Sequence, residues 1–402
     1  MIDLVNEAAS RIKGVVTRTP LIPSSTLSRL FGFEVWLKLE NLQKTGSFKV
    51  RGAFNKISSL TDADKARGVV AASSGNHAQG VAWASSLLGV KSLVIMPENA
   101  PIVKFVATKS YGAEVSFHGA DFFEAYRFAI GYARDRGLAF IPPFEDDLVI
   151  AGQGTIGLEI LEDLPDADTI VVPIGGGGLI SGIAAAVKNT RPSITVIGVE
   201  AGASSSCMES IRQGRPVEVK GRPTIADGIA VKRVGDKTFG MITRFVDMVV
   251  DAGEDSIAGA ILKLLERKKL MVEGAGAVTI AAAMEGKLPR SVKKAVFVLS
   301  GGNIDVTMLD RVIRLGLLRE GRIIRLSTVI RDIPGALAGL TALIAGLKAN
   351  ILHVIHQREA IEVPVDSTRI EIILEVEGPD HSERILKALK EGGYELEERG
   401  QF

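Results

Sequence analysis

Short hydrophobic segments alternate with helical segments from residue 34 to about residue 320, and this alternation restricts the fold more than any other feature of the sequence. Several of the short segments are apolar throughout, which is typical of strands buried on both faces of a sheet. Helical periodicity follows most of them. The pattern therefore predicts an α/β protein with mainly parallel sheets. The expected strands are residues 68–73, 92–97, 168–174, 195–200, 246–250 and 294–300.

A closed barrel of parallel strands would show the same alternation of strands and helices. The unequal spacing of the strands and the glycine-rich loops between them favour open sheets instead.

Residues 322–402 follow a different pattern, βαββαβ, which is the element order of a small ferredoxin-like domain. The first helix of this part is expected to start near Asp332, with Asp332 as its cap and Pro334 in its first turn. We place the domain boundary in the charged stretch 319–321. The chain is thus divided into residues 1–320 and residues 321–402.

Charge and cysteine content narrow the classes of protein to consider. Lys and Arg number 48 and Asp and Glu number 47, a net charge of +1, which argues against nucleic-acid and membrane-surface binding. The single cysteine, Cys207, excludes an internal disulfide and suits a reducing compartment. The N-terminus lacks a signal peptide, and Pro173 and a run of glycines interrupt the longest uncharged stretch, residues 169–187. We therefore expect a cytoplasmic protein without a membrane span.

Four consecutive glycines, Gly175 to Gly178, lie between an expected strand and an expected helix. Backbone amides of such a loop can converge on one anion, and the N-terminus of the following helix adds a favourable dipole. The loop is not a Walker A motif, and Ile180 or Ser181 occupies the third glycine position of a dinucleotide-binding motif. A dinucleotide site remains the alternative at this point, because Glu200 ends the next strand.

Lys49 is expected in the first turn of a helix that follows Ser47, a favourable N-cap residue. The positive end of the helix dipole lowers the pKa of a lysine there, which makes its amine a better nucleophile for a carbonyl. Schiff-base chemistry requires such a lysine. An ordinary solvated lysine is the alternative.

Two further polar loops follow strands at their carboxyl ends, where ligands of α/β sheets bind. The segment SSGNHAQG, residues 73–80, opens a helix and can hold a carboxylate or a phosphate. The segment SGGN, residues 300–303, follows the last expected strand. The sequence shows no zinc-ligand spacing and no motif of a Ser-His-Asp hydrolase.

Taken together and in this order, the Lys49 segment GSFKVRGA, SSGNHAQG, GGGGL and SGGN resemble the fold-type II pyridoxal-phosphate enzymes. Within that family the chain resembles the threonine dehydratases (threonine ammonia-lyases) over residues 5–318. Further segments that carry the resemblance are TRTPL (17–21), LKLENLQKTGSFK, GQGTIGLEI (152–160), TIADGIAV (224–231) and VEGAGA. The resemblance implies two open α/β sheets, with a smaller mobile subdomain at about residues 50–150. It also implies that residues 321–402 form an ACT-like regulatory domain.

The resemblance assigns roles to individual residues. Lys49 would carry pyridoxal 5′-phosphate as a Schiff base and later move the Cα proton, and Ser74 would reprotonate the opposite face, as in serine racemases. Cofactor binding is implied for Phe48, Lys49, Asn76, Gly175, Gly176, Gly177, Gly178, Leu179, Glu273 and Ser300. Substrate binding is implied for Ser73, Gly75, Asn76 and His77. An effector would bind Asp332, Pro334, Gly335, Ala336 and Leu337. A monovalent or divalent cation would bind near Glu200.

The expected reaction is β-elimination from L-threonine to give 2-oxobutanoate and ammonia, with L-serine as a second substrate that gives pyruvate. A serine racemase or serine dehydratase is one alternative. A non-catalytic amino-acid sensor is another, which the retained Lys49 disfavours. The expected partners are the amino-acid substrate, an amino-acid effector and further copies of the chain, as a homodimer or homotetramer. Nucleic acid and membrane are not expected.

Overall fold

The computed structural model describes residues 1–358 and 363–397. The chain divides into two compact units, residues 1–305 and residues 306–402. Helix α14 (Val306–Arg319) is grouped with the second unit, and the boundary expected at residues 319–321 falls at the C-terminal end of that helix. In the described part of the chain, no helix is both long enough and apolar enough to cross a membrane.

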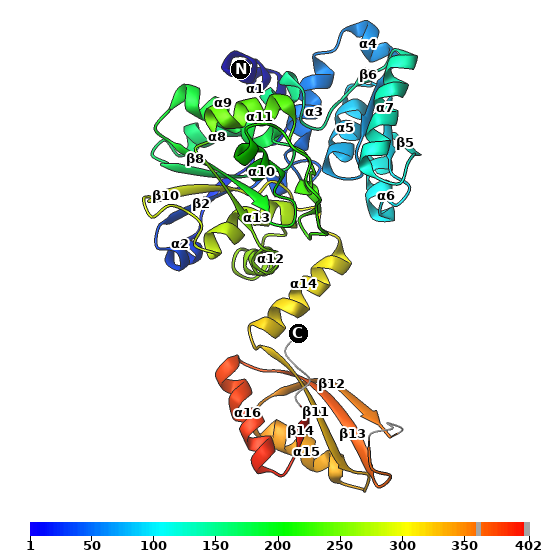
Figure 1. Cartoon of the computed structure of the whole chain (residues 1–402), viewed down its shortest axis with the longest axis vertical. Coiled ribbons are helices and arrows are strands. Elements are labelled where there is room, and N and C mark those ends of the chain that lie inside the picture. The colour runs from blue at the N-terminus through cyan, green and yellow to red at the C-terminus, as the bar shows by residue number, and fades with distance from the viewer. Residues whose placement is uncertain (359–362, 398–402) are drawn as a thin grey trace. The chain divides into compact units, whose positions relative to one another are not determined.

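The larger sheet of the first unit has six strands in the order β1-β2-β10-β7-β8-β9 (Figure 1). All neighbouring strands are parallel except β1, which pairs with β2 in the antiparallel direction. The strands are β1 (Leu21–Pro23), β2 (Glu34–Lys38), β7 (Thr169–Pro173), β8 (Thr195–Ala201), β9 (Met248–Ala252) and β10 (Lys294–Val298). The residues of β7, β8 and β10 are buried on both faces, as their apolar sequences predict, apart from the first residues of β8 and β10.

The smaller sheet has four parallel strands in the order β5-β4-β3-β6 and lies within residues 50–150. Its strands are β3 (Val69–Ala72), β4 (Ser92–Met96), β5 (Glu114–Phe117) and β6 (Ala139–Phe140). Its helices, drawn in blue and cyan in Figure 1, are α4 (Asp62–Arg67), α5 (Asn76–Leu87), α6 (Ile102–Ser110) and α7 (Phe122–Arg136). Both sheets have free edge strands, so the prediction of open sheets in an α/β protein is confirmed.

The rest of the first unit contributes further helices. They are α1 (Ile2–Ile12), α2 (Ser25–Phe31), α3 (Lys49–Ser58), α8 (Asp147–Asp163), α9 (Gly178–Thr190), α10 (Ser206–Gln213), α11 (Asp236–Phe245), α12 (Glu254–Lys268) and α13 (Gly274–Met284). Short 3-10 helices are formed by η1 (Glu40–Leu42) and η2 (Asp227–Ile229). Helices α8 and α9 approach closely through glycines, because a Cβ at Gly154 would lie 2.8 Å from the Gly182 carbonyl oxygen.

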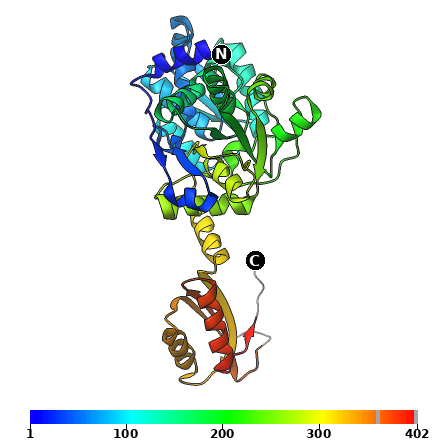
Figure 2. The ribbon, with the colours of Figure 1, turned by 90° about the vertical axis from the view of Figure 1, so that its left-hand side faces the viewer.

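The second unit continues after α14 with β11 (Ile323–Arg331), α15 (Ala336–Gly346), β12 (Asn350–Gln357), β13 (Ser367–Glu375), α16 (Pro379–Glu391) and β14 (Leu396–Glu397). Its sheet has the antiparallel order β12-β13-β11-β14. Helices α15 and α16 pack on one face of this sheet through a shared apolar core (Figure 2). The βαββαβ order expected from the sequence is therefore present, although residues 359–360 and 398–400 of the expected strands lie outside the described residues.

The start of α15 differs from the sequence prediction. The helix begins at Ala336, and its N-cap residue is Gly335, with a φ of 89° and no side-chain cap. Residues 333–335 form a turn, so Pro334 precedes the helix. Asp332 pairs instead with Arg358, whose Nε lies 3.0 Å from the carboxylate.

Candidate active site

Lys49 is the first residue of α3, as the sequence predicts, but its surroundings differ from those expected. Its Nζ donates a hydrogen bond to the Pro143 carbonyl oxygen at 2.9 Å and lies 5.2 Å from the centre of the Phe48 ring. Burial lowers the pKa of Lys49 to about 8, opposed by the carboxylate of Glu273. Desolvation, rather than the helix terminus alone, is thus the main cause of the lowered pKa.

Ser47 does not cap α3. Phe48 holds the N-cap position without a side-chain hydrogen bond, and Ser47 instead forms an isolated antiparallel bridge with Gly301. This bridge and the bond from Phe48 N to the Ser300 carbonyl oxygen, 3.1 Å long, tie the start of α3 to the loop after β10. The N-cap prediction is wrong because the chain at Ser47 is drawn into this bridge.

The glycine loop runs from the end of β7 to the first residue of α9. Gly177 has a φ of 92°, which favours glycine, and α9 starts without a side-chain cap. A Cβ at Gly176 would overlap the Phe144 ring, and one at Gly178 would lie 2.8 Å from the Phe144 Cβ. The loop therefore presents free amides at a helix N-terminus in a space that side chains would fill, and this fits the phosphate group of the expected cofactor.

Asn76, at the start of α5, lies between two partners. Its Nδ2 donates to Glu273 Oε1 at 2.6 Å, and its Oδ1 accepts from Asn303 Nδ2 at 2.8 Å. Asn303 also donates to the Thr45 carbonyl oxygen at 2.7 Å. The loops after β3 and β10 and the start of α13 are therefore joined by side chains near Lys49.

Burial, followed by the charge of Asp227, raises the pKa of Glu273 to about 7. The Glu273 carboxylate also explains Gly301, because a Cβ there would overlap it. Ser300 is buried, and its Oγ donates to the Ala275 carbonyl oxygen at 3.3 Å. Glu273 and Ser300, both predicted to contact the cofactor, thus lie on elements that meet at the same place.

Ser73, Ser74 and Gly75 form the loop between β3 and α5, and Asn76 and His77 are the first residues of α5. Helix α5 starts after Gly75 without a side-chain cap, so its first amides are free to bind an anion. His77 is buried, and its Nε2 bonds to the Ile141 carbonyl oxygen at 2.9 Å. Burial, followed by the Lys49 charge, lowers the pKa of His77 to about 3, so its imidazole is neutral. Ser73 and Ser74 lie partly exposed in the same loop.

Glu200, near which a cation is expected, bonds to the backbone at the start of α10. Its two carboxylate oxygens accept the amides of Cys207 and Met208 at the start of α10, each at 2.8 Å. Burial raises the pKa of Glu200 to about 7. Over residues 1–358 and 363–397, no group of three His, Cys, Asp or Glu side chains can hold one metal ion. The cation expected near Glu200 therefore stays a prediction.

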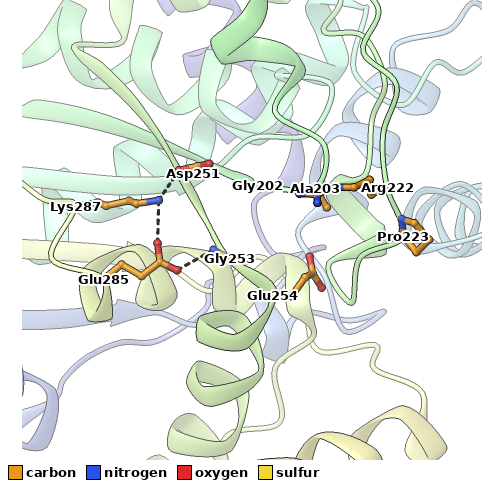
Figure 3. A pocket seen from close by; sticks show the side chains of 9 residues that line it. All are labelled: Gly202, Ala203, Arg222, Pro223, Asp251, Gly253, Glu254, Glu285 and Lys287. Atoms are coloured by element: carbon orange, nitrogen blue, oxygen red, sulfur yellow. Dashed lines mark hydrogen bonds and ion pairs between the residues drawn. The ribbon is translucent and has the colours of Figure 1, made fainter. Parts of the chain in front are cut away.

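A pocket of about 400 Å³ lies at the carboxyl ends of β8 and β9 (Figure 3). Figure 3 shows Lys287 between Asp251 and Glu285, with Glu285 also accepting the Gly253 amide. None of the residues predicted for the active site lines this pocket. Its paired charges indicate a structural ion cluster rather than part of the site around Lys49.

Pro143 and Phe144 are the site residues that the sequence prediction missed. Pro143 acts through its backbone carbonyl, and Phe144 acts through the packing of its ring on the glycine loop. No local sequence motif marks either contact. Both arise because the segment between β6 and α8 passes close to Lys49 and to the glycine loop, which are distant from it in the sequence.

Comparison with known proteins identifies relatives over nearly the whole chain. Residues 12–301 match the family model described as "Pyridoxal-phosphate dependent enzyme". An L-threonine ammonia-lyase of Thermotoga maritima is 50% identical over 392 residues, 98% of each chain. The processed form of threonine deaminase isoform 2 from Solanum lycopersicum matches with a TM-score of 0.74 and 36% identity, over 79% of this chain and 88% of that one. Maize serine racemase matches with a TM-score of 0.74 and 36% identity, over 78% and 98%.

Proposed function

The chain belongs to the family of pyridoxal-phosphate dependent enzymes, and on that premise we propose that it is a threonine ammonia-lyase, which converts L-threonine to 2-oxobutanoate and ammonia. The observation that carries the chemistry is the desolvated Lys49 amine, with a pKa of about 8, in the site that also contains the glycine loop. The full-length similarity to an L-threonine ammonia-lyase supports the choice of substrate.

Pyridoxal phosphate, when bound, supplies an electron sink for the electrons released at Cα. The amides of Gly175 to Gly178 and of Leu179 would hold its phosphate. The Lys49 Nζ would hold it covalently, and Phe48, Asn76, Glu273 and Ser300 would line the site of its ring. Ser300 presents a neutral hydroxyl rather than a carboxylate, so it does not favour a positive charge on the ring nitrogen.

Lys49 also acts as the base. With a pKa near 8, about a tenth of its amine is unprotonated at pH 7, far more than for an ordinary lysine, so Nζ can accept the Cα proton of the substrate. The burial that lowers the pKa also keeps water from competing for that proton.

The substrate carboxylate binds the loop of Ser73, Gly75, Asn76 and His77. A neutral His77 offers no positive charge to the carboxylate, so the main attraction comes from the free amides at the start of α5. This arrangement orients Cα without placing a second cation beside Lys49, which keeps the pKa of Lys49 from falling further.

L-Serine is the second substrate that we propose. It lacks one methyl group of threonine, and a methyl in an apolar pocket discriminates by only about 1–3 kcal/mol. Serine racemisation is the alternative reaction, supported by the likeness to maize serine racemase and by Ser74 in the substrate loop. Racemisation would require Ser74 to deliver a proton to the face of Cα opposite Lys49.

The second unit is an ACT-like regulatory domain in this proposal. Its βαββαβ order and its sheet order β12-β13-β11-β14 support the assignment. The amides at the start of α15, after Gly335, can hold an effector carboxylate, with Ala336 and Leu337 beside it. Because Asp332 is paired with Arg358, an effector ammonium would have to compete with that guanidinium. A branched-chain amino acid such as isoleucine is the first candidate, and a homodimer or homotetramer is the expected assembly.

The experiment is an assay of the purified protein for its cofactor colour and its products. We expect a yellow protein that releases ammonia and 2-oxobutanoate from threonine, and borohydride should fix the colour on Lys49. A colourless protein that binds NAD instead would contradict the proposal. D-Serine formed from L-serine faster than pyruvate would favour the racemase.

A further inference from the structure

Four charged side chains that the proposed chemistry does not use lie together at the start of α3, on the side of the helix away from Lys49. Lys38, Glu40 and Arg51 are fully buried, and the Glu159 side chain is 13% exposed. Two carboxylates and two cations make the cluster neutral. We call these four residues the Arg51 cluster.

Arg51 is the centre of the Arg51 cluster. Its Nε and Nη2 bond the two oxygens of Glu40 at 2.9 and 2.8 Å, and its Nη1 and Nη2 bond the two oxygens of Glu159 at 2.6 and 3.0 Å. Further acceptors are the Thr155 Oγ1 at 3.1 Å and the Thr17 carbonyl oxygen at 3.3 Å. Every nitrogen of the guanidinium is therefore bonded, in the bidentate geometry that arginine provides and lysine does not.

Lys38 closes the cluster on its other side. Its Nζ donates to Glu159 Oε2 at 2.6 Å and to the Thr19 carbonyl oxygen at 2.8 Å. The Thr19 hydroxyl in turn donates to Glu40. The cluster thus links β2, η1, α3, α8 and the segment before β1.

This cluster joins several of the segments that carry the family resemblance. TRTPL supplies Thr17 and Thr19, LKLEN supplies Lys38 and Glu40, FKVRGA supplies Arg51, and GQGTIGLEI supplies Thr155 and Glu159. None of these side chains is needed for the proposed binding of cofactor or substrate. A buried ionic cluster is weak evidence for stability, because apolar residues of similar volume often serve the fold as well. A geometric requirement near Lys49 is the better explanation.

Helix geometry relates Arg51 to Lys49. Residues two apart on an α-helix point in directions that differ by about 200°. The Arg51 side chain therefore holds the first turn of α3 from the side of the helix opposite to the Lys49 side chain. The turn is held from other sides too, because a Cβ at Gly80 of α5 would lie 3.1 Å from the Lys49 backbone and one at Gly152 of α8 would lie 2.6 Å from the Arg51 carbonyl oxygen.

We propose that Arg51 is a positioning residue, which fixes the first turn of α3 so that the Lys49 amine stays in its desolvated place against the Pro143 carbonyl. This inference deepens the proposed function and rests on the role given there to Lys49. Arg51 touches neither cofactor nor substrate and acts only through the helix.

The test compares Arg51→Lys with wild type in two measurements. The first is the pKa of Lys49 in the protein freed of cofactor, from pH-dependent acetylation followed by mass spectrometry. The second is the steady-state kinetics of the loaded enzyme with threonine. A lysine keeps the charge but cannot bond both carboxylates, so the turn loosens and water reaches Lys49. We expect the pKa of Lys49 to rise by about one unit, and kcat to fall about tenfold with KM changed less than about threefold.

The matched control is Lys56→Met, which removes another ion pair between α3 and the start of α8. Lys56 Nζ lies 2.7 Å from Asp146, and both side chains are 20% exposed. This variant should change neither the pKa of Lys49 nor kcat. If Arg51→Lys does not fold, Glu159→Gln decides the same question, because it leaves the bonds between Arg51 and Glu40 in place.

An unchanged pKa of Lys49 in the folded variant, with any loss of kcat matched by Lys56→Met, would overturn the inference. The measurement on the cofactor-free protein also separates this inference from the proposed function. A wild-type protein that does not act on threonine would contradict the function, whereas the response of the Lys49 pKa to Arg51→Lys would still be decided.

Discussion

Asn76 and Glu273 are joined by a hydrogen bond of 2.6 Å, which connects the start of α5 beside the smaller sheet to the start of α13 beside the larger sheet. Asn303 fixes the amide orientation by donating to the Asn76 oxygen. One Nδ2 proton of Asn76 is thereby donated to Glu273, and the other would be available to the ring oxygen of the proposed cofactor. The two sheets are thus connected by a side chain that also belongs to the proposed cofactor site.

Replacement of Lys49 by alanine should abolish the release of ammonia from threonine and leave the fold intact. The substitution removes the proposed nucleophile and base, and it opens no cavity in an apolar core because the Lys49 amine lies in a polar site, bonded to the Pro143 carbonyl oxygen. Steady-state ammonia assays and circular dichroism check this expectation. Lys44→Ala, at an exposed position of the preceding loop, is the control and should keep its activity. Turnover above trace level in Lys49→Ala, with cofactor exchange excluded, would remove Lys49 from the mechanism.

Substitutions at Gly177 should separate backbone strain from charge. Gly177→Ala and Gly177→Asp share a φ of 92° and a Cβ that would lie 2.8 Å from Thr238, so both should destabilise the fold, with about 1–2 kcal/mol from the backbone alone. Only the aspartate adds a charge that repels a phosphate. Titration of the apoprotein with cofactor should give an affinity about tenfold lower for Asp than for Ala. Equal affinities would place the phosphate away from this loop.

The raised pKa of Glu273 predicts a pH-dependent stability. Burial raises this pKa to about 7, above the ordinary value of 4.5, so the folded state binds the proton more tightly than the unfolded chain. Glu273 therefore stabilises the fold below pH 4.5, and this contribution is lost as the pH rises to about 7. Up to about 3 kcal/mol is involved.

Urea unfolding of the cofactor-free protein between pH 5 and pH 8 measures this loss. Glu273→Gln should lose less stability over this range than wild type, and Glu98→Gln, at an exposed position, should behave like wild type. Glu200 titrates in the same window and keeps part of the pH dependence in every variant. Identical pH profiles for wild type and Glu273→Gln would show that Glu273 is ionised in the folded protein.

Removal of residues 321–402 should leave the chemistry and abolish the response to amino-acid effectors. Every residue proposed to bind cofactor or substrate lies in the unit of residues 1–305. The comparison is threonine turnover of the full-length and shortened proteins with a panel of branched-chain amino acids. A full-length enzyme that neither binds nor responds to any of them would reduce the second unit to an assembly element. A folded but inactive shortened protein would show that the second unit is needed for catalysis.

The elements predicted best from the sequence are those with a strong local signal. The apolar segments expected at 68–73, 168–174 and 294–300 correspond to β3, β7 and β10, because a strand buried on both faces must be apolar throughout. Strands β5 and β6 were not predicted. β5 is a largely exposed edge strand and β6 has only two residues, so neither produces a hydrophobic pattern.

The candidate site residues proposed from the sequence are those that lie in a local motif. The residues that were missed lie in no such motif. Lys49 and the four glycines could be proposed from the sequence because a lysine at a helix start and a run of four glycines between a strand and a helix are each a local pattern with a chemical meaning. Phe144 could not, because its ring contacts a loop that is distant in the sequence. The sequence also placed Asp332 as a cap, whereas Arg358, more than twenty residues later, takes its carboxylate.

The segment between β6 and α8 contacts several parts of the proposed active site and fixes the distances between them. The Pro143 carbonyl bonds the Lys49 amine, and the Phe144 ring packs on the glycine loop. Two consecutive residues therefore fix the distance between the amine and the loop proposed to bind the phosphate. The next residue, Glu145, accepts the Thr238 amide at 3.1 Å and places α11 as well. Loops of this length usually tolerate insertions and deletions. Here a single added residue would displace three elements at once, so the length of this loop is as constrained as the identities of Phe144 and Glu145.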